Sequence, residues 1–540
     1  MAEDTTMDSQ EQILSGSGIP IKAIYIPEVL KGASYEKDIG LPGQPPFTRG
    51  VYPTMYRGRL WTIRRYSGVN TPEDTNELYR REYELGQTGF SMAYDVPTGF
   101  GLDSDDPRAF ADVGDAGVPV SSLEDMEITF EGLPLDKVGT ALEASTMAGC
   151  PLTAMYLTVA EKRGYDLGQL RGTTLNDLCA SATCAGNAYQ IPPQALLRLS
   201  ADFIEWCCDV APKWHPMCLD SYPYREQGIN AIQELGLILA TAIQYLEEGK
   251  RRGRVPLDRF VRRFAFNMGI HNDFFEEIAK LRAGRRMWYR IAKERYGIDD
   301  PQCWLFRLHV QSAGCTHTTQ EPLNNLVRIG YQMLAACLGG AQSMHANGYD
   351  EGVCLPTEQS MLLSIRTGQI LQHETGVINT VDPLGGSWFV ESLTNEIEQR
   401  TWEYIQQIED MGGMAEAISS GWVHREYKQA MLEHERKVAS GETAIVGVNR
   451  FRLEKEPYDV PIFRPNPKSP DIQVERLRRL KKERDNARVE QALRKLEEVS
   501  RIDQNVMPAV MEAVKAYATV GEVHDVWRRV FGLWAGPMGI

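Results

Sequence analysis

The sequence predicts an α/β protein, a parallel (β/α)8 TIM barrel with an extended N-terminal arm and a C-terminal helical extension. Between about residue 50 and residue 395, short apolar or β-branched runs alternate with amphipathic stretches about eight times, which is the pattern of a parallel barrel. An open doubly wound sheet is the rival architecture, but no glycine-rich dinucleotide turn follows an early strand. We therefore expect an arm over residues 1–45, a barrel over 46–395 and a helical region over 396–540.

The N-terminal arm is polar and then rich in glycine and proline, with one apolar patch, IPIKAIYIPEVL. Such a segment is expected to lie extended on another surface, which we assign to a partner subunit. The first residues, MAEDTTMDSQEQ, are acidic and polar, so no signal or transit peptide is expected. No apolar run is long enough to span a bilayer, and the expected compartment is the cytoplasm.

The predicted strands are GFSMAYDV, KVGTALEA, GTTLNDL, PMCLDSY, RRFAFNMG, WLFRLHVQ, GAQSMHAN and VINTVDP. Chemistry in a parallel barrel lies where the strands end. Polar residues that end strands are therefore candidate site residues, with a helix cap as the alternative for each. They are Asp95, Asn176, Asp177, Tyr222, Gln311, His345 and Asn347.

The C-terminal region is helical and strongly charged. VERLRRLKKERDNARVEQALRKLEEVSR alternates charge sign at helical spacing and predicts a solvated or partner-packed helix. The final stretch, NVMPAVMEAVKAYATVGEVHDVWRRVFGLW, is amphipathic and is expected to pack on the protein or on a partner. The formal net charge of -15 argues against nucleic-acid binding. The ten cysteines lack zinc spacing, so we interpret them as reduced core thiols and predict no metal site.

Aromatic and basic residues are concentrated between Pro46 and Gly68, in PFTRGVYPTMYRGRLWTIRRYSG. Aromatic faces beside guanidinium groups suit a flat, anionic, partly apolar ligand, such as a nucleotide or a CoA thioester. The alternative is a surface loop and edge strand of ordinary charge.

This run is one of many segments that resemble the methylmalonyl-CoA mutase family, the adenosylcobalamin-dependent acyl-CoA mutases. The others include GQTGFSMAYDVPT, DSDDPRAFADVGDAGV, SYPYREQG, RLHVQSAG, GGAQSMHANGYDE and VDPLGGSWFVE, and they follow in order along nearly the whole chain. Length and tail most resemble the large subunits of two-subunit members, such as 2-hydroxyisobutyryl-CoA and isobutyryl-CoA mutase. The resemblance implies an acyl-CoA threaded along the barrel axis, with adenosylcobalamin (coenzyme B12) over the C-terminal face.

The resemblance also implies partners. The family's cobalt-ligating motif, Asp-x-His-x-x-Gly, does not occur in the sequence. A small cobalamin-binding subunit is therefore expected to ligate the cobalt, in a heterotetramer of two large and two small subunits. A G-protein chaperone is a further expected partner.

Site residues follow from the family pattern, each with an ordinary barrel-mouth side chain as its alternative. The resemblance implies catalytic roles for Tyr66, which wedges between substrate and adenosyl group, and for Gln311 and Tyr222. It implies contacts to CoA or substrate from Tyr52, Thr54, Arg59, Arg64, Ser91, Tyr94, Arg263 and His309. It implies cofactor contacts from Glu226, Asn347, Glu351, Gly314 and Ala116, with Glu351 and Asn347 holding the ribose.

Two departures from the family concern the acyl pocket. Members with dicarboxylic substrates carry an arginine in the stretch that reads LNDLCASATCAGNAYQIPP here, where Ala185 and Gly186 stand instead and Leu175 replaces a glutamine. The family histidine that hydrogen-bonds the thioester carbonyl is Pro223, which has no side-chain donor. Tyr224 and His215 are open substitutes for it.

A third departure is Glu143, in KVGTALEAST, where the family has small or hydroxyl residues. An inward carboxylate needs a partner. It either hydrogen-bonds a hydroxyl or amine of the substrate or pairs with an arginine as a structural group. With small residues at Ala93 and Gly99, these departures predict a mutase for a non-dicarboxylic, bulky or functionalised acyl-CoA. The alternatives are a non-catalytic acyl-CoA-binding subunit and a radical mutase for a substrate that is not a CoA ester.

Overall fold

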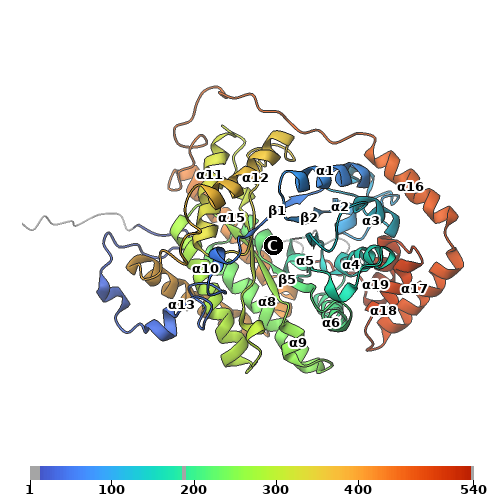
Figure 1. Ribbon diagram of the computed structural model, residues 1–540, viewed down its shortest axis with the longest axis horizontal. Coiled ribbons are helices and arrows are strands. Elements are labelled where there is room, and N and C mark those ends of the chain that lie inside the picture. The colour runs from blue at the N-terminus through green and yellow to red at the C-terminus, as the bar shows by residue number, and fades with distance from the viewer. Residues whose placement is uncertain (1–12, 185–189, 537–540) are drawn as a thin grey trace, which may run out of the picture.

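The centre of the molecule is a closed barrel of eight parallel strands that pair in sequential order, β1 to β8. The computed structural model describes residues 13–184 and 190–536, and Figure 1 shows the barrel enclosed by helices. The predicted (β/α)8 barrel is confirmed. The strands are β1 Thr62–Ser67, β2 Gly89–Ala93, β3 Gly139–Glu143, β4 Gly172–Leu175, β5 His215–Asp220, β6 Ala265–Ile270, β7 Leu308–Ser312 and β8 Ser343–His345.

One predicted strand is wrong and one real strand was missed. The run VINTVDP forms consecutive turns, with Asp382 at φ 49°. The remaining strand is β1, which lies inside the aromatic and basic run. Its residues 63, 65 and 67 are buried, whereas 62, 64 and 66 are partly or fully exposed. The polar residues Arg64 and Tyr66 face the barrel interior, so the strand lacks the apolar run that identified the others.

Helices surround the barrel and continue beyond it to the C-terminus. They are α1 Pro72–Glu84, α2 Val96–Gly99, α3 Leu123–Thr129, α4 Thr146–Lys162, α5 Leu178–Thr183, α6 Pro193–Val210, α7 Tyr222–Glu226, α8 Ala231–Arg252, α9 Leu257–Val261, α10 Phe274–Tyr289, α11 Asn324–Leu338, α12 Glu358–His373, α13 Trp388–Asp410, α14 Met414–Ser419, α15 Trp422–Ser440, α16 Ser469–Glu483, α17 Asn486–Arg501, α18 Met507–Lys515 and α19 Val520–Phe531. Within the described residues, no helix is both long and apolar enough to cross a bilayer.

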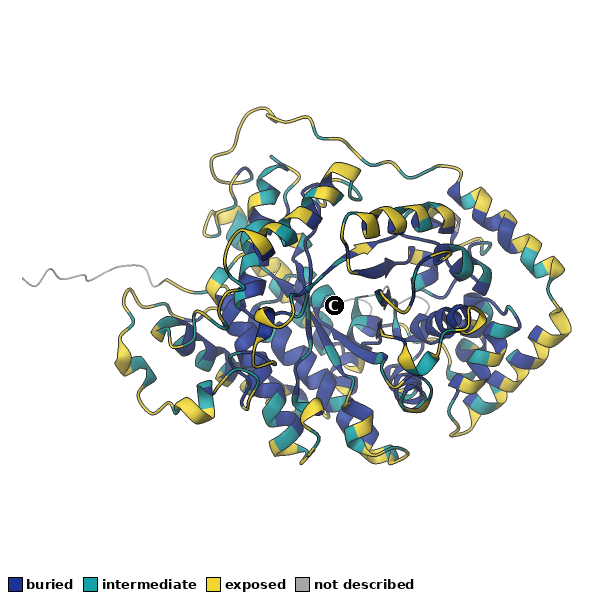
Figure 2. Ribbon diagram, viewed as in Figure 1, coloured by how far each residue is buried: buried dark blue, intermediate teal, exposed yellow. Residues whose placement is uncertain are grey.

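The hydrophobic core lies between the strands and the surrounding helices (Figure 2). Phe266 of β6, for example, faces outward and packs with ring centroids 5.1 Å from Trp288 and 4.0 Å from Phe306. Its side chain is fully buried. The apolar residues of each strand therefore point outward and pack against the helices, and the inward positions are free for other residue types.

The described part of the N-terminal arm lies on helices of its own chain, α10 and α13. Ser15 Oγ donates a 2.6 Å hydrogen bond to Glu276, and the Tyr25 and Phe389 rings lie 4.8 Å apart. Isoleucines 13, 24 and 26 remain exposed on the arm. The contact with a partner subunit stays a prediction.

The C-terminal helices form a separate layer beside α3 and α4. An irregular segment over residues 441–468 crosses one edge of the barrel, at the top of Figure 1, and leads to α16. The charged run expected as one helix is divided between α16 and α17, because Asp485 caps α17 by accepting from the backbone N–H of Arg488 at 3.1 Å. Helices α18 and α19 pack on α4.

Candidate functional site

The interior of the barrel is polar and partly open to solvent. Bulky branched side chains fill the interior of most TIM barrels. Here the inner positions include small residues and polar residues that are only partly buried, and Tyr66 is 40% exposed. The partly exposed inner residues are Thr62, Arg64, Tyr66, Glu143, Thr173, His215, His309 and Ser343. The strands thus surround space for a ligand.

Arg64 lies across the inner wall of β2 and β3. A Cβ atom on Gly89 would stand 3.0 Å from Nε of Arg64, and one on Gly139 would stand 2.9 Å from a terminal guanidinium nitrogen. Burial lowers the pKa of Arg64, and Glu143 opposes that effect. Gly89 and Gly139 therefore make room for the Arg64 guanidinium inside the barrel. Nε of Arg64 has no hydrogen-bond partner among the described residues.

Tyr66 stands two residues further along β1, toward the C-terminal mouth. Its backbone N–H donates a 2.7 Å hydrogen bond to Nδ1 of His345. Although the side chain is partly exposed, the surrounding barrel desolvates the Tyr66 hydroxyl and raises its pKa, and the carboxyls of Glu143, Asp220 and Glu351 raise it further. The phenol therefore stays protonated in a site surrounded by acidic groups.

Five of the predicted residues meet at the C-terminal mouth. The Tyr222 hydroxyl accepts a 3.3 Å hydrogen bond from the backbone N–H of Gly314, and Glu226 accepts one of 2.7 Å from Cys315. Gln311 donates to Oδ1 of Asn347 at 3.1 Å. A Cβ on Gly314 would stand 3.1 Å from both the Tyr222 hydroxyl and Glu226. Only glycine fits here without displacing those side chains.

The two remaining cofactor candidates differ. Burial raises the pKa of Glu351 to about 7; Arg65 opposes this, and Asp350 and Glu226 add to it. The Glu351 carboxyl therefore interacts electrostatically with Glu226 of the mouth. Ala116 is exposed on the segment that follows β2.

Basic residues gather at the opposite, N-terminal end of the barrel. Arg171, Arg263 and Arg307 each lie one or two residues before a strand. Burial lowers the pKa of Arg263, and the neighbouring Arg262 and Arg171 lower it further. Tyr52 opposes the shift at both Arg263 and Arg307. Thr54 and Arg59, predicted for the same function, are exposed on the segment that leads into β1.

Neither proposed substitute for the family histidine is placed to replace it. Pro223 lies in the first turn of α7. The fully buried Tyr224 donates its hydroxyl to Asp177. His215 begins β5 at the other end of the barrel, where its ring lies 2.9 Å from the carbonyl oxygen of Arg263. The stretch with Ala185 and Gly186 lies outside the described residues.

Glu143 faces the interior at the end of β3. Its strand neighbour in register is Ala93, and Ser91 and Tyr66 pair in the preceding layer. Burial raises the pKa of Glu143 to about 7, while Ser91 and Arg64 oppose the shift. No ion pair within 4.0 Å joins Glu143 to another described residue, so the arrangement gives no support to a structural pairing with arginine. Tyr94, which is 6% exposed, has a hydroxyl without a hydrogen-bond partner in the described chain.

Sequence reasoning missed two acceptors of the interior, Asp220 and Asn267. Asp220 ends β5 in PMCLDSY and accepts a 2.8 Å hydrogen bond from Asn267 of β6. It also missed Arg307, the residue directly before β7. For Asp220 and Arg307 the available signal was position, because each stands at the end of a strand that the alternation of the sequence already marked. Asn267 lies inside β6 and gave no such signal.

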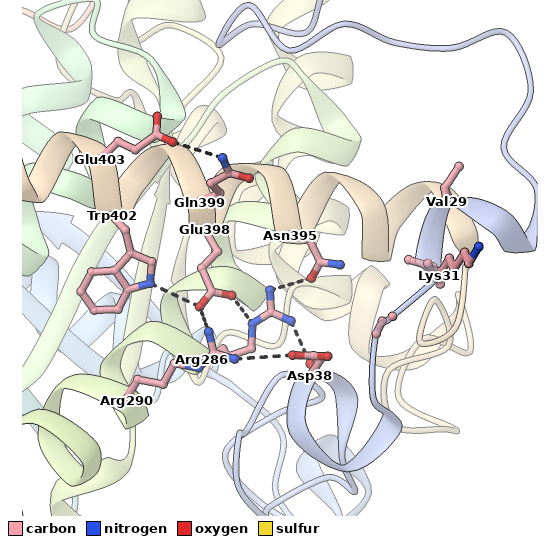
Figure 3. A pocket seen from close by; sticks show the side chains of 13 residues that line it. Val29, Lys31, Asp38, Arg286, Arg290, Asn395, Glu398, Gln399, Trp402 and Glu403 are labelled. Atoms are coloured by element: carbon pink, nitrogen blue, oxygen red, sulfur yellow. Dashed lines mark hydrogen bonds and ion pairs between the residues drawn. The ribbon is translucent and has the colours of Figure 1, made fainter.

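A second hollow, of about 570 Å³, lies between the N-terminal arm and α13 (Figure 3). Its charged groups pair with one another: Arg290 bonds Glu398, and Arg286 donates to Asn395 at 2.8 Å. Arg290 also pairs with Asp38 of the arm at 3.5 Å, so this hollow is a seam between the arm and helices of its own chain.

All ten cysteines are free thiols, and six of them are buried. Over the described residues, no group of three or more His, Cys, Asp or Glu side chains could hold a metal ion.

The sequence matches the family model of methylmalonyl-CoA mutase over residues 14–533. The methylmalonyl-CoA mutase of Rhizobium meliloti (strain 1021) is 39% identical over 519 residues, which cover 95% of this chain and 72% of the relative. The 2-hydroxyisobutanoyl-CoA mutase large subunit of Aquincola tertiaricarbonis is 38% identical over 528 residues, which cover 98% of this chain and 93% of the relative. The human mitochondrial methylmalonyl-CoA mutase is 37% identical over 518 residues, with 95% and 68% covered.

Proposed function

The chain belongs to the methylmalonyl-CoA mutase family, a family of isomerases, and from this premise we propose that it is the large, substrate-binding subunit of an adenosylcobalamin-dependent acyl-CoA mutase. The observation that carries the proposal is the polar, partly open barrel interior, which has arginines at its N-terminal end and a cluster of carboxyl and amide groups at its mouth. An ordinary barrel interior would be filled. Residues 46–395 would form the catalytic barrel, with residues 1–45 and 396–540 serving assembly.

The two ends of the interior suit the two ends of an acyl-CoA. Guanidinium groups bind phosphates by charge-assisted hydrogen bonds, so Arg263, with Tyr52, Thr54 and Arg59 beside the same entrance, would hold the nucleotide end. Arg64, Ser91 and His309 face the interior between the two ends, and with Tyr94 they would line the route inward. The thioester and acyl group would then lie near Tyr66 and Gln311.

The mouth residues fit a large polar cofactor. Oε1 of Glu226 is buried without a hydrogen-bond partner among the described residues, and Gly314 keeps the surface beside it bare of a side chain. Adenosylcobalamin, when bound, supplies a carbon-centred radical by homolysis of its cobalt–carbon bond. Glu226, Gly314 and Ala116 would face it, Asn347 and Glu351 would hold the ribose, and Tyr222 would close the site against water.

Tyr66 and Gln311 would position the reacting groups. The Tyr66 ring would stand between the acyl group and the adenosyl group, and Gln311 would orient the thioester. The reaction would move the thioester group to the neighbouring carbon, with return of the abstracted hydrogen. The protein's contribution is orientation and exclusion of water.

The substrate we propose is a non-dicarboxylic acyl-CoA. The chain has no arginine between Leu175 and Pro193, so that stretch offers no guanidinium to a second carboxylate. A Cβ on Gly99 would meet no atom within 4 Å, which leaves room for a bulky acyl group. Pro223 favours a second candidate, a subunit that binds acyl-CoA without turnover, because it cannot donate a hydrogen bond to the thioester.

The partner we propose is a small cobalamin-binding subunit that ligates the cobalt, in a cytoplasmic heterotetramer that a G-protein chaperone could serve. The absence of Asp-x-His-x-x-Gly from the sequence and the 93% coverage of a relative named as a large subunit support this assignment.

The test is reconstitution. The full chain is mixed with a short Asp-x-His-x-x-Gly cobalamin protein encoded beside it and with adenosylcobalamin, and a panel of CoA esters is assayed for rearranged product. Product that requires both subunits supports the proposal. Tight CoA-ester binding without product from any ester would favour the non-catalytic subunit, and product from the large subunit alone would contradict the division of labour.

A further inference from the structure

Two acidic side chains face the barrel interior at the ends of β3 and β5. Glu143 is the last residue of β3. Gly139 begins the same strand on the same face, and a Cβ atom on it would point toward the Arg64 guanidinium. Asp220 is the last residue of β5 and pairs in register with Asn267, which pairs with the inward-facing His309. One strand separates β3 from β5, so the two backbones lie about 10 Å apart. Both residues face the interior, on either side of β4.

Asp220 has an unused acceptor. Its Oδ1 accepts from Asn267 at 2.8 Å and from the backbone N–H of Tyr222 at 3.3 Å. Its Oδ2 accepts no hydrogen bond from any described residue, although the side chain is only 7% exposed. Because Oδ2 is not among the fully buried unpaired atoms of the described chain, it is open to the barrel interior and can accept a hydrogen bond from a ligand.

The surroundings supply little positive charge. The charged neighbours of Asp220 are the carboxyls of Glu143 and Asp177. Arg64 is the basic group that lowers the pKa of Glu143. It forms no ion pair with that carboxyl within 4.0 Å. The acyl end of the interior is therefore rich in acceptors, and a carboxylate placed there would be repelled.

We propose that Glu143 and Asp220 form a specificity pair that binds a hydrogen-bond-donating group, a hydroxyl or an amine, on the acyl chain of the substrate. This inference rests on the proposed acyl-CoA mutase function and names its substrate class. An ionised carboxyl is an acceptor only, so the pair selects O–H or N–H and disfavours a second carboxylate. Tyr66 pairs in register with Ser91, two residues before Ala93, and Ala93 pairs with Glu143, so the bound group would lie near the Tyr66 ring.

The protonation behaviour of the two acids agrees with this assignment. Burial raises the pKa of Glu143 to about 7 and raises that of Asp220 as well, and the Glu143 carboxyl raises the pKa of Asp220 further. A donor bound between them would stabilise the ionised forms. An ammonium group would do so more strongly than a hydroxyl.

Binding measured by calorimetry tests the pair without requiring turnover. The full chain is titrated with CoA esters that differ in one substituent at carbon 2 or carbon 3 of a butyryl chain: hydroxyl, amino, methyl or carboxyl. We expect the hydroxyl and amino esters to bind about 10-fold or more tightly than the isosteric methyl ester, and the carboxyl ester to bind most weakly. The ratio of amino to hydroxyl affinity tells which donor the site prefers.

The variants Glu143→Gln and Asp220→Asn keep side-chain size and remove the charge. Each should reduce the preference for donor esters over the methyl ester to about 3-fold or less and should improve binding of the carboxyl ester. Glu84→Gln, on the exposed end of α1, is the matched control and should keep the wild-type order. Equal binding of donor and methyl esters by the wild-type chain would overturn the inference while leaving the proposed function intact. Failure of every CoA ester to bind would instead remove the proposed function.

Discussion

The backbone N–H of Tyr66 donates a 2.7 Å hydrogen bond to Nδ1 of His345, and this bond joins β1 to β8 beyond the end of their register. Strand pairing between them stops at Ile63 and Met344. Burial lowers the pKa of His345 to about 3, so the ring is neutral at physiological pH. Because Nδ1 is the acceptor, the proton is on Nε2. A neutral imidazole therefore positions the backbone that carries the proposed catalytic ring.

Replacing His345 should affect turnover more than binding. His345→Phe fills the space but leaves the Tyr66 N–H without an acceptor, and we expect kcat to fall about 10-fold or more with KM changed by less than about 3-fold. Steady-state kinetics of the reconstituted complex measure both. His345→Asn, which restores an acceptor, should recover part of kcat. Equal changes in kcat and KM for both variants would speak against a positioning role.

Tyr66 itself should be dispensable for binding CoA esters. Tyr66→Phe keeps the ring and loses the hydroxyl, and Tyr66→Ala removes the wedge between the two proposed ligands. We expect Tyr66→Ala to lower kcat about 100-fold or more, with Tyr66→Phe in between, while calorimetric affinity for the CoA ester stays within about 3-fold. An affinity loss as large as the kcat loss would assign the ring to substrate binding instead.

The sequence was sufficient for the barrel because outward-facing residues such as Phe266 and Val310 keep the apolar alternation that a helix-covered strand needs. It failed at β1, where Arg64 and Tyr66 line a solvated interior, and at VINTVDP, where an apolar start leads into turns. The family pattern indicated Tyr222, Glu226 and Gly314, which do meet. It could not indicate that Asp220 and Glu143 both face the interior, since that depends on strand register, including the shift between β4 and β5.

The arginines at the N-terminal end should recognise the nucleotide part of CoA. Arg263→Gln removes a cation beside the Tyr52 segment, and we expect about 10- to 100-fold weaker binding of a CoA ester, since a charge-assisted hydrogen bond contributes about 1.5–3 kcal/mol. The matching pantetheine thioester lacks the nucleotide phosphates and should bind the variant and the wild type alike.

Arg488→Gln, on the exposed surface of α17, is the control and should change neither affinity. If Arg263→Gln weakened both thioesters equally, the arginine would be supporting the fold of the entrance and not the phosphates.

Glu143 should make stability depend on pH. Its pKa is raised from 4.5 to about 7, so between these values the folded protein binds more protons than the unfolded chain. Stability is therefore highest below about pH 4.5 for this group and falls as pH rises toward 7, by about 1–3 kcal/mol. Urea denaturation of wild type and Glu143→Gln across this range measures the contribution of the group as the difference between two curves.

We expect Glu143→Gln to become relatively more stable than wild type as pH rises from 5 to 8, because the amide has no proton to lose. Glu84→Gln, at an exposed position, should stay parallel to wild type. Parallel curves for Glu143→Gln and wild type would mean that the carboxyl ionises without cost inside the barrel.

A buried ion network beneath β6 should be essential for stability. Lys280 donates to Glu234 at 2.6 Å and to the carbonyl oxygen of Gly269 at 2.7 Å, and it also pairs with Glu277. All three charged side chains are fully buried. Glu234 in turn accepts from Ser221 at 2.9 Å, directly before the helix that carries Tyr222 and Glu226. The network thus anchors the base of the mouth.

Lys280→Met would leave two buried carboxyls with Arg225 as their one remaining cation among the described residues, at 3.7 Å from Glu234 and 3.4 Å from Glu277. Breaking a buried pair on one side costs about 3–5 kcal/mol, so we expect a loss of that size in urea denaturation. Adding Glu277→Gln should restore part of it, because one of the two stranded charges is removed. Lys162→Met breaks a largely exposed pair with Glu127 and should cost about 1 kcal/mol or less. A Lys280→Met protein as stable as Lys162→Met would show that the carboxyls are protonated in the fold and that the lysine does not hold the mouth together.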